Sequence, residues 1–329
     1  MIAHRLYVGT IGEGLFRSLD GGESFHRACE GMFVECHVRA LAVHPQQPAT
    51  LYLGSELGLF VSRDGAESWT KLPAPLEGLQ VWSLEIVPKQ PEVLIVGTCP
   101  SHLFRSEDGG HTWSEAVARL ERECPRLLWT RVTCIVGAPE EPNLLWAGVE
   151  IDGVHQSRDG GRTWQAIGSG LSSRDIHALA VLPAQGGRPY RLLAATNNDL
   201  NLSEDGGLTW RPLHIDQVMP WSYCRTLIQP CGRPQEILLG NGDAPPGSAG
   251  VIGRSLDGGL TWQLADMPGR ANSTIWNFAV HPADPQMIYA SSVSGQVYRS
   301  LDGGASWQRL SREFGEIRAL AWAPNAEPI

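Results

Sequence analysis

Short apolar runs bounded by Gly, Pro or Asp recur along the whole chain, which is typical of β-strands joined by tight turns. The runs fall into groups. Within each group, one strand precedes an Asp-Gly turn, as Gly14–Arg17 does, and another follows it, as Trp69–Leu72 does. A third strand follows after a loop and leads to a proline, and a fourth comes next. Four strands in each group predict four-stranded antiparallel sheets.

The third and fourth strands can be located in all seven groups. The proline-ended strands are Val38–Pro45, Val81–Pro88, Val132–Pro139, Ile176–Pro183, Tyr223–Pro230, Ile275–Pro282 and Ile317–Pro324. The strands that follow them are Leu51–Gly54, Leu94–Gly97, Leu144–Gly148, Arg191–Ala195, Glu236–Gly240, Met287–Ala290 and, at the start of the chain, Arg5–Gly9. The last sheet is therefore assembled from the two ends of the chain.

The turn within each group is an octapeptide, Ser-x-Asp-Gly-Gly-x-Ser/Thr-Trp. Its seven copies begin 44 to 52 residues apart, at Ser18, Ser62, Ser106, Ser157, Ser203, Ser255 and Ser300. This spacing is the length of one propeller blade. Two copies differ from the pattern: Phe25 replaces Trp, and Ala66 replaces a Gly at a position where we expect mild backbone strain.

The aspartates of the octapeptides are predicted to be structural. An Asp side chain in a turn accepts hydrogen bonds from backbone N–H groups and from the following Ser or Thr hydroxyl. The closing Trp then packs between sheets. The seven structural aspartates are Asp20, Asp64, Asp108, Asp159, Asp205, Asp257 and Asp302.

The strand pattern predicts an all-β fold: a single seven-bladed β-propeller domain over residues 1–329. Its ring closes when the C-terminal strand, residues 317–322, pairs with the N-terminal strands within residues 5–27. This closure removes an exposed sheet edge. The alternative architecture is an open β-solenoid, in which the two ends have no reason to complement each other.

The octapeptide, the blade length and the number of copies resemble the BNR/Asp-box propeller superfamily over essentially the whole chain. That superfamily includes six-bladed sialidases, xyloglucan-degrading glycoside hydrolases with paired seven-bladed propellers, sortilin-type receptors and the photosystem II assembly propeller. The resemblance implies the fold and leaves the activity open, because one fold hosts many functions. The sialidase-type Arg-Ile-Pro motif is not found near the N-terminus.

Charge and composition narrow the partners. The formal net charge of −9 and the lack of a Lys/Arg-rich run argue against a nucleic-acid partner. No apolar run approaches the ~18 residues of a membrane span, and the start of the chain lacks the pattern of a secretory signal. The seven cysteines include no CxxC pair, so we expect reduced thiols in a cytoplasmic protein, a monomer or small oligomer.

The predicted functional face lies opposite the Asp-box turns, where loops lead into the inner strands around the axial channel. Aligned from the closing proline, one inner-strand position holds Arg39, Trp82, Thr133, His177, Cys224, Trp276 and Arg318. The adjoining loops are rich in carboxylates, amides and indoles. Such groups line sites for sugars or small polar ligands. The alternative is a purely structural role, in which the tryptophans cap blade interfaces and Arg39 and Arg318 pair with Glu56, Glu13 or Glu316.

The preferred hypothesis is a binding site for a small polar or carbohydrate-like ligand, or for a partner protein. Its ligand-binding candidates are Arg39, Trp82, Arg131, Arg225, Trp276, Asn277 and Arg318. The alternative is a glycoside-hydrolase-like enzyme, or another hydrolase or lyase, at the same channel mouth. Glycosidic cleavage needs two carboxyl groups ~5–9.5 Å apart. The catalytic candidates are Glu56, Glu150, Asp152, His177 and Tyr223.

A metal site is a further alternative. The sequence requires no cofactor, and it has no HxH or HExxH spacing that would indicate a divalent metal. Histidines from several blades are nevertheless able to meet at a propeller axis. The candidate ligands are His37, His102 and His177.

Overall fold

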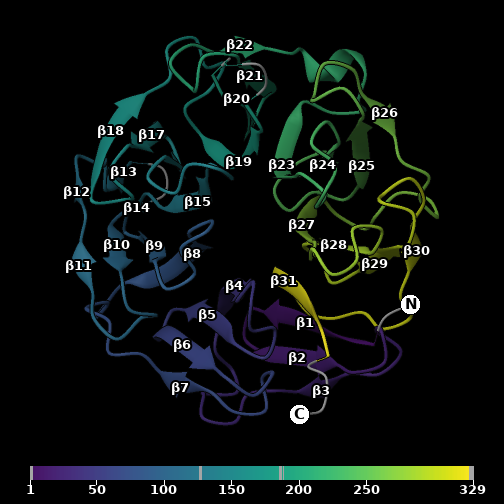
Figure 1. The fold of residues 1–329 in the computed structure, drawn as a ribbon. Coiled ribbons are helices and arrows are strands. Elements are labelled where there is room, and N and C mark those ends of the chain that lie inside the picture. The colour runs from purple at the N-terminus through teal and green to yellow at the C-terminus, as the bar shows by residue number, and fades with distance from the viewer. Residues whose placement is uncertain (1–2, 126–127, 185–186, 188, 326–329) are drawn as a thin grey trace.

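The computed structural model describes residues 3–125, 128–184, 187 and 189–325. Seven antiparallel sheets surround a central axis as the blades of a propeller (Figure 1). The predicted all-β, seven-bladed fold is confirmed. Blade 1 combines the two ends of the chain, and blades 2 to 7 follow in chain order.

Each blade has four main strands, which run from the axis to the rim. The innermost strands, from blade 1 to blade 7, are β31 (Ile317–Pro324), β4 (Val38–Val43), β8 (Gln80–Ile86), β15 (Val132–Gly137), β19 (Ile176–Leu182), β23 (Tyr223–Ile228) and β27 (Ile275–Ala279). The second strands are β1 (His4–Thr10), β5 (Leu51–Ser55), β9 (Leu94–Cys99), β16 (Leu145–Val149), β20 (Arg191–Thr196), β24 (Ile237–Gly242) and β28 (Ile288–Ser292).

The two outer positions of each blade flank the Asp box. The third strands are β2 (Leu15–Ser18), β6 (Gly58–Ser62), β10 (Leu103–Ser106), β17 (Gly153–Ser157), β21 (Leu200–Ser203), β25 (Gly250–Ser255) and β29 (Val297–Ser300). The rim strands are β3 (His26–Arg27), β7 (Thr70–Lys71), β11 (Ser114–Glu115), β18 (Thr163–Ile167), β22 (Arg211–Pro212), β26 (Gln263–Leu264) and β30 (Gln308–Arg309).

A few short elements lie outside this pattern. They are β12 (Val117–Ala118), β13 (Glu123–Cys124), β14 (Leu128–Trp129) and the 3-10 helix η1 (Ile215–Gln217). Strand β12 pairs in parallel with β18, so the loop that leaves blade 3 is attached to blade 4. The described part of the chain contains no helix that is long and apolar enough to cross a membrane.

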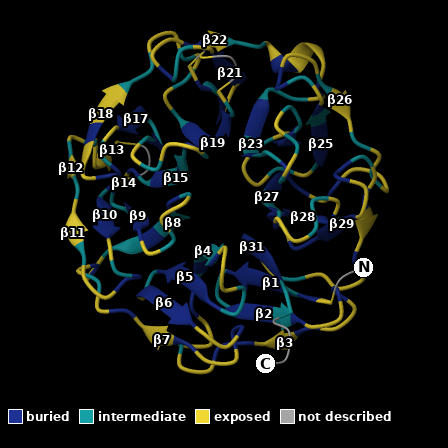
Figure 2. Cartoon of the chain, in the orientation of Figure 1, coloured by how far each residue is buried: buried dark blue, intermediate teal, exposed yellow. Residues whose placement is uncertain are grey.

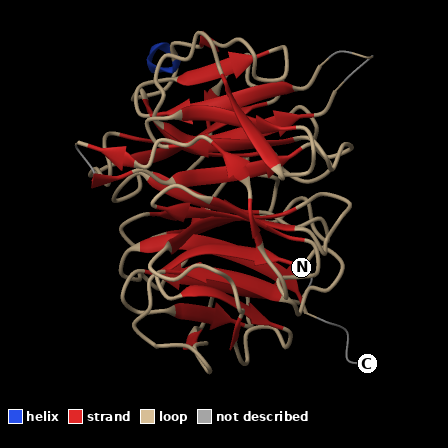
Figure 3. Ribbon diagram, turned by 90° about the vertical axis from the view of Figure 1, so that its left-hand side faces the viewer, coloured by secondary structure: helices blue, strands red, loops and turns tan. Residues whose placement is uncertain are grey.

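Blade 1 closes the ring as the sequence predicts. Strand β31 pairs antiparallel with β1, from His4 opposite Pro324 to Thr10 opposite Ile317. The two faces of the propeller are distinct in the side view: both chain ends lie on one face and η1 lies on the other (Figure 3). The second and third strands of the blades are largely buried, whereas the rim is exposed (Figure 2).

The Asp-box turns have the predicted structural role. Asp205 accepts hydrogen bonds from Ser203 Oγ at 2.8 Å, from the Thr209 backbone N–H at 2.9 Å and from Thr209 Oγ1 at 2.5 Å. Burial alone would raise the pKa of Asp205, but the hydrogen bonds from Thr209 and Ser203 outweigh it and hold the pKa below its usual value. The other six boxes make the same bonds from the hydroxyl of the closing Ser or Thr.

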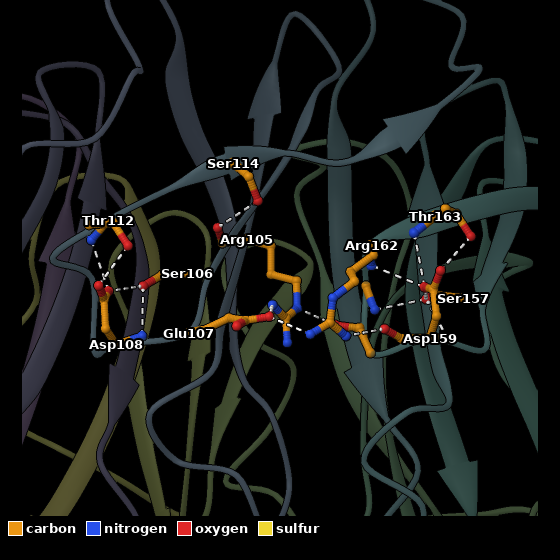
Figure 4. Close-up of polar contacts among 12 residues, drawn as sticks. Arg105, Ser106, Glu107, Asp108, Thr112, Ser114, Ser157, Asp159, Arg162 and Thr163 are labelled. Carbon is orange, nitrogen blue, oxygen red and sulfur yellow. Dashed lines mark hydrogen bonds and ion pairs between the residues drawn. The ribbon is translucent and has the colours of Figure 1, made fainter.

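Ala66 confirms the expected local strain, because it has a φ of 65° where most of the other boxes place glycine. Figure 4 shows two of the boxes and the bridge between them. Glu107 pairs with both Arg105 of blade 3 and Arg162 of blade 4. Arg105 Nε also donates to the Gly160 carbonyl at 2.7 Å. Neighbouring boxes are therefore linked across the blade interface.

Replacement of an Asp-box carboxylate is expected to destabilise the fold without altering its charge pattern elsewhere. Asp205→Ala leaves the turn hydroxyls and N–H groups without their acceptor, at a cost of about 1–2 kcal/mol, comparable to the loss of a helix cap. Denaturant unfolding measures this change. The control is Glu204→Ala, which removes the same charge from the adjacent exposed residue. Equal destabilisation by the two variants would contradict the structural role.

Candidate functional site

Every innermost strand contains a β-bulge near its start. In β4, Val38 pairs with Ser55 and Ala40 pairs with Gly54, so Arg39 has no partner across the ladder. A bulge redirects a side chain away from the regular sheet. The unpaired residues in the seven blades, which we call the bulge ring, are Arg318, Arg39, Trp82, Thr133, His177, Arg225 and Trp276. All seven line one axial cavity of about 330 Å³.

Blade 6 corrects the sequence alignment. Counting back from the closing proline predicts Cys224 at the ring position, but Arg225 is the unpaired residue. Cys224 instead pairs with Asn241 and is buried in the core between blades 5 and 6. The reason is that β23 has one residue fewer between its bulge and Pro230 than the other inner strands have. Arg225 was predicted as a ligand-binding residue but not at this position of the ring.

Two tryptophans of the ring are each held between two arginines. The guanidinium carbons of Arg39 and Arg131 lie 4.3 and 4.4 Å from the ring centroid of Trp82. Those of Arg225 and Arg318 lie 3.8 and 4.4 Å from that of Trp276. Cation–π contacts of this kind fix the direction of a guanidinium group. Both indoles therefore orient cations at the channel rather than only capping a blade interface.

The arginines of the channel are only partly neutralised. Arg131 Nε lies 2.7 Å from Glu150 Oε2, and Arg318 pairs with Glu316. Among the described residues, neither Arg39 nor Arg225 forms a salt bridge, so the pairs of Arg39 with Glu56 or Glu13 do not form. Burial, with the nearby Arg318 charge, lowers the pKa of Arg39, and burial likewise lowers that of Arg225. An arginine remains a cation even so.

Above the ring, two carboxyl groups are shifted in opposite directions. Burial raises the pKa of Glu150, and the nearby Asp175 carboxylate adds to this effect. Burial alone would raise the pKa of Asp175 too, but the His177 hydrogen bond and the positive charges of His177, Arg225 and Arg131 lower it overall. The surroundings of the two groups therefore shift the pKa of Glu150 upward and that of Asp175 downward.

His177 and Tyr223 complete this polar group. His177 Nδ1 donates to the Cys224 carbonyl at 2.7 Å, and its Nε2 lies 3.6 Å from Asp175 Oδ1. Burial lowers the pKa of His177, and the hydrogen bond with Asp175 acts in the opposite direction. Its ring lies 5.0 Å from that of Tyr223, and burial raises the pKa of the tyrosine. The candidates Glu150, His177 and Tyr223 therefore lie together, beside Asp175.

The channel mouth opens into a cavity of about 850 Å³ on the side of blade 6. The loop between β24 and β25 lines this cavity through Asp243 and Pro245–Pro246. The Asp243 carboxylate is used within the loop, where it accepts from the Ser248 backbone N–H at 2.8 Å. Trp221 also lines this cavity, and the guanidinium carbon of Arg270 lies 5.4 Å from its ring centroid.

Two catalytic candidates have structural roles instead. Glu56 accepts a hydrogen bond from the His37 backbone N–H at 2.7 Å and lies outside the mouth cavity. Asp152 is buried and binds His155 Nε2 at 2.9 Å, Arg174 Nη2 at 2.9 Å and a backbone N–H of the preceding loop. Neither carboxylate is among the residues that line the mouth cavity beside Glu150. The ligand-binding candidate Asn277 lines the axial cavity and donates to Ser291 Oγ at 3.0 Å.

The structure does not assemble the three metal-binding candidates. Within residues 3–325, gaps apart, no three His, Cys, Asp or Glu side chains lie close enough to hold a metal ion. His102 Nδ1 instead contacts Glu115 Oε1 at 2.7 Å. His37 contributes its backbone to the Glu56 contact, and His177 belongs to the Asp175 group described above.

Glu85 is a channel residue that the sequence analysis missed. It stands among apolar neighbours on β8, and Gly137 N–H donates to its Oε1 at 3.1 Å. Burial raises its pKa to about 8, so this carboxyl is largely protonated at neutral pH. The signal was present in the sequence, since Leu84-Glu85-Ile86 places a lone acid in an apolar strand.

Fold and site together define a class: a seven-bladed Asp-box propeller with a cationic, tryptophan-lined ring at its axis. Residues 13–138 match the Sortilin-Vps10 family (Sortilin, neurotensin receptor 3). A probable oligoxyloglucan-reducing end-specific xyloglucanase of Neosartorya fischeri is 23% identical over 286 residues, covering 70% of this chain and 34% of that protein. The chain therefore spans about a third of the length of this curated relative.

Two solved structures share the fold. The GH74 enzyme of Niastella koreensis has a TM-score of 0.62 at 14% identity, covering 96% of this chain and 66% of that one. A structure of YCF48 bound to D1 peptide has a TM-score of 0.57 at 16% identity, covering 83% and 81%. The predicted resemblance to sortilin-like and xyloglucanase-like propellers is confirmed. At these identities the solved structures show the fold alone.

The buried carboxyl of Glu85 predicts a pH-dependent stability. Its pKa is about 8 in the folded protein and ~4.3 in an unfolded chain. Between these values the folded state holds the extra proton, so stability falls as pH rises. We expect Glu85→Gln to melt close to the wild type near pH 4.5 and several degrees above it at pH 8. The control is Glu77→Gln, at an exposed loop position. A difference from the wild type that does not change with pH would contradict this.

Proposed function

We propose that this propeller binds an anionic ligand, one that carries a carboxylate or a similar oxyanion, at the bulge ring. The observation that carries the proposal is the arrangement of Arg39, Arg225 and Arg318 around one cavity of about 330 Å³. Guanidinium groups have a planar fork that matches an oxyanion in two-point contact. Their stacking on Trp82 and Trp276 orients them before a ligand arrives.

The charge balance supports an anion. The whole chain has a net charge of −9, yet Arg39 and Arg225 line the channel with no ion pair among the described residues. Partly buried cations without a counter-charge are costly to a fold. Departures of this kind from the rules of stability concentrate at functional sites. An anionic ligand would add to the partial counter-charge that Glu150 and Asp175 provide near Arg225 and that Glu56 provides near Arg39.

The mouth cavity favours a ligand that extends beyond its charged group. Trp221 and the Pro245–Pro246 segment offer flat apolar surfaces beside the polar pair of Glu150 and Asp175. An acidic sugar or a peptide carboxylate has both kinds of group. The similar proteins are compatible with either ligand, since one solved propeller of this fold is YCF48 bound to D1 peptide and the curated relative is named as a xyloglucanase.

Loss of a ring arginine is expected to weaken the binding of an anion. Glucuronate and glutarate serve as probes, measured by isothermal titration calorimetry. Arg39→Gln and Arg225→Gln each remove a charge-assisted hydrogen bond, so the dissociation constant rises by roughly tenfold or more. Added salt weakens binding by the wild type only modestly, because the site is partly buried.

The control is Arg309→Gln, at a rim position whose side chain is 53% exposed. This variant also loses one positive charge, but at a position outside the channel. We expect it to bind both probes as tightly as the wild type. The proposal fails if the wild type binds neither probe, or if the ring variants and the rim variant bind equally well.

A hydrolase acting at the same mouth is the second candidate. The observation that favours it is that the pKa values of two carboxyl groups are shifted in opposite directions, upward for Glu150 and downward for Asp175. Such a divergence separates a general acid from a carboxylate base or nucleophile. In this alternative, Glu150 protonates the leaving group, and Asp175 acts from the opposite side with Tyr223 nearby.

Hydrolysis of a glycoside by the protein would support the hydrolase alternative. An aryl glucuronide and xyloglucan oligosaccharides are incubated with the protein, and product release is followed. A hydrolase is expected to lose at least a hundredfold in rate on Glu150→Gln, because a general acid contributes about that much. Glu123→Gln, at an exposed position, keeps the wild-type rate. If the wild type releases no product from either substrate, the hydrolase is rejected and the binding role stands.

A further inference from the structure

The axial channel continues past the bulge ring into an apolar part. A second cavity of about 460 Å³ lies along the inner strands, toward their closing prolines. Glu85 and Ile228 line this lower cavity and the ring cavity alike, so the two adjoin. Large apolar side chains from five blades form the walls of the lower cavity, among them Leu41, Leu84, Ile86, Ile228, Phe278 and Leu320.

The apolar walls face an open lumen and not a sealed core. Leu41, Ile86 and Phe278 are each only half-buried, although they lie on the innermost strands of the fold. Their remaining surface is therefore in contact with the channel. Apolar side-chain surface that faces the lumen is removed from water when a hydrocarbon ligand covers it, which favours binding. A lumen of this kind is poorly matched to a sugar or to a simple inorganic anion.

The lower cavity holds little charge. Its ionisable groups among the described residues are Glu85, Lys89 and His281. Glu85 has a raised pKa and His281 a lowered one, both because of burial, so both are largely neutral near pH 7. Lys89 pairs with Glu140. The charge asymmetry along the axis therefore comes from the arginines of the ring.

We infer that the ligand is a single-chain amphiphile whose anionic head group binds at Arg39, Arg225 and Arg318 while its hydrocarbon chain occupies the lower cavity. This inference rests on the proposed function, since it needs the ring to be the anion site. In six of the seven blades the inner strand runs six residues from the ring to its proline, or about 20 Å at the usual rise of a strand. That length suits a chain of medium size.

The affinity of a homologous series tests the inference. Butyrate, hexanoate, octanoate and decanoate are titrated into the wild-type protein below their micelle concentrations. Each methylene that enters an apolar site contributes about 0.8 kcal/mol, so affinity is expected to rise roughly threefold to fourfold per methylene. Decyltrimethylammonium, with the same chain and a cationic head, is expected not to bind.

A variant with a filled lower cavity tests the binding of the hydrocarbon chain separately from the binding of the head group. Ala42 lines the lower cavity, and Ala42→Trp would fill part of it. This variant is expected to lose the dependence on chain length while it still binds glucuronate. The matched control is Ala305→Trp at the variable position of an Asp box, where other copies already carry Leu, Arg or His. It should keep the full dependence on chain length.

The outcomes also distinguish the two proposals. If glucuronate binds and decanoate binds no more tightly than butyrate, the amphiphile is rejected and the anion site stands. If no carboxylate binds, both fail. Equal binding of the cationic and anionic ten-carbon chains would likewise overturn the inference. Should Ala42→Trp fail to fold, the wild-type series combined with Arg39→Gln still decides, because the variant must lose affinity for every chain length by a similar factor.

Discussion

The β-bulge near the start of each inner strand is the feature on which the rest of the channel depends. A bulge needs a close neighbour that leaves it room, and here that neighbour is a small residue on the second strand. In blade 2, Gly54 pairs with Ala40, directly after the bulge. A Cβ on Gly54 would lie 2.3 Å from Val81 Cγ1 of the next blade. The absent side chain therefore lets the next blade approach at the level of its own bulge. Glycine takes this position in five blades: Gly9, Gly54, Gly97, Gly148 and Gly240.

The fold was predictable because its information is local and repeated. Each Asp box specifies its own turn through bonds within eight residues, and seven copies at blade spacing leave little freedom for the overall architecture. Counting from the closing proline predicted the ring residue correctly in six blades and wrongly in blade 6. The position of a bulge is fixed by pairing with the second strand, not by the distance to the closing proline. Since β23 has one residue fewer between its bulge and Pro230, counting from Pro230 selected Cys224 in place of Arg225.

The roles of single carboxylates were much less predictable. Nothing in the neighbours of Glu56 and Asp152 along the chain reveals their partners, which are a backbone N–H for Glu56 and two basic side chains for Asp152. Glu85, by contrast, was not predicted as a site residue. An acid within an apolar strand indicates a channel residue only once the strand is known to face a lumen. In each case the decisive partner comes from a segment far away in sequence or from a backbone group.

The electrostatics of the molecule limit what the ring can select by charge alone. A chain with a net charge of −9 repels anions at long range, and that repulsion is screened beyond about 8–10 Å in physiological salt. The arginines act only once a ligand has entered the channel. Recognition therefore needs contacts beyond the charge itself. The aromatic wall around Trp221 lies on one side of the ring and the apolar lumen on the other. A ligand that combines an anionic group with a sizeable uncharged part is thus favoured over small anions, which meet the same repulsion and gain none of the added contact.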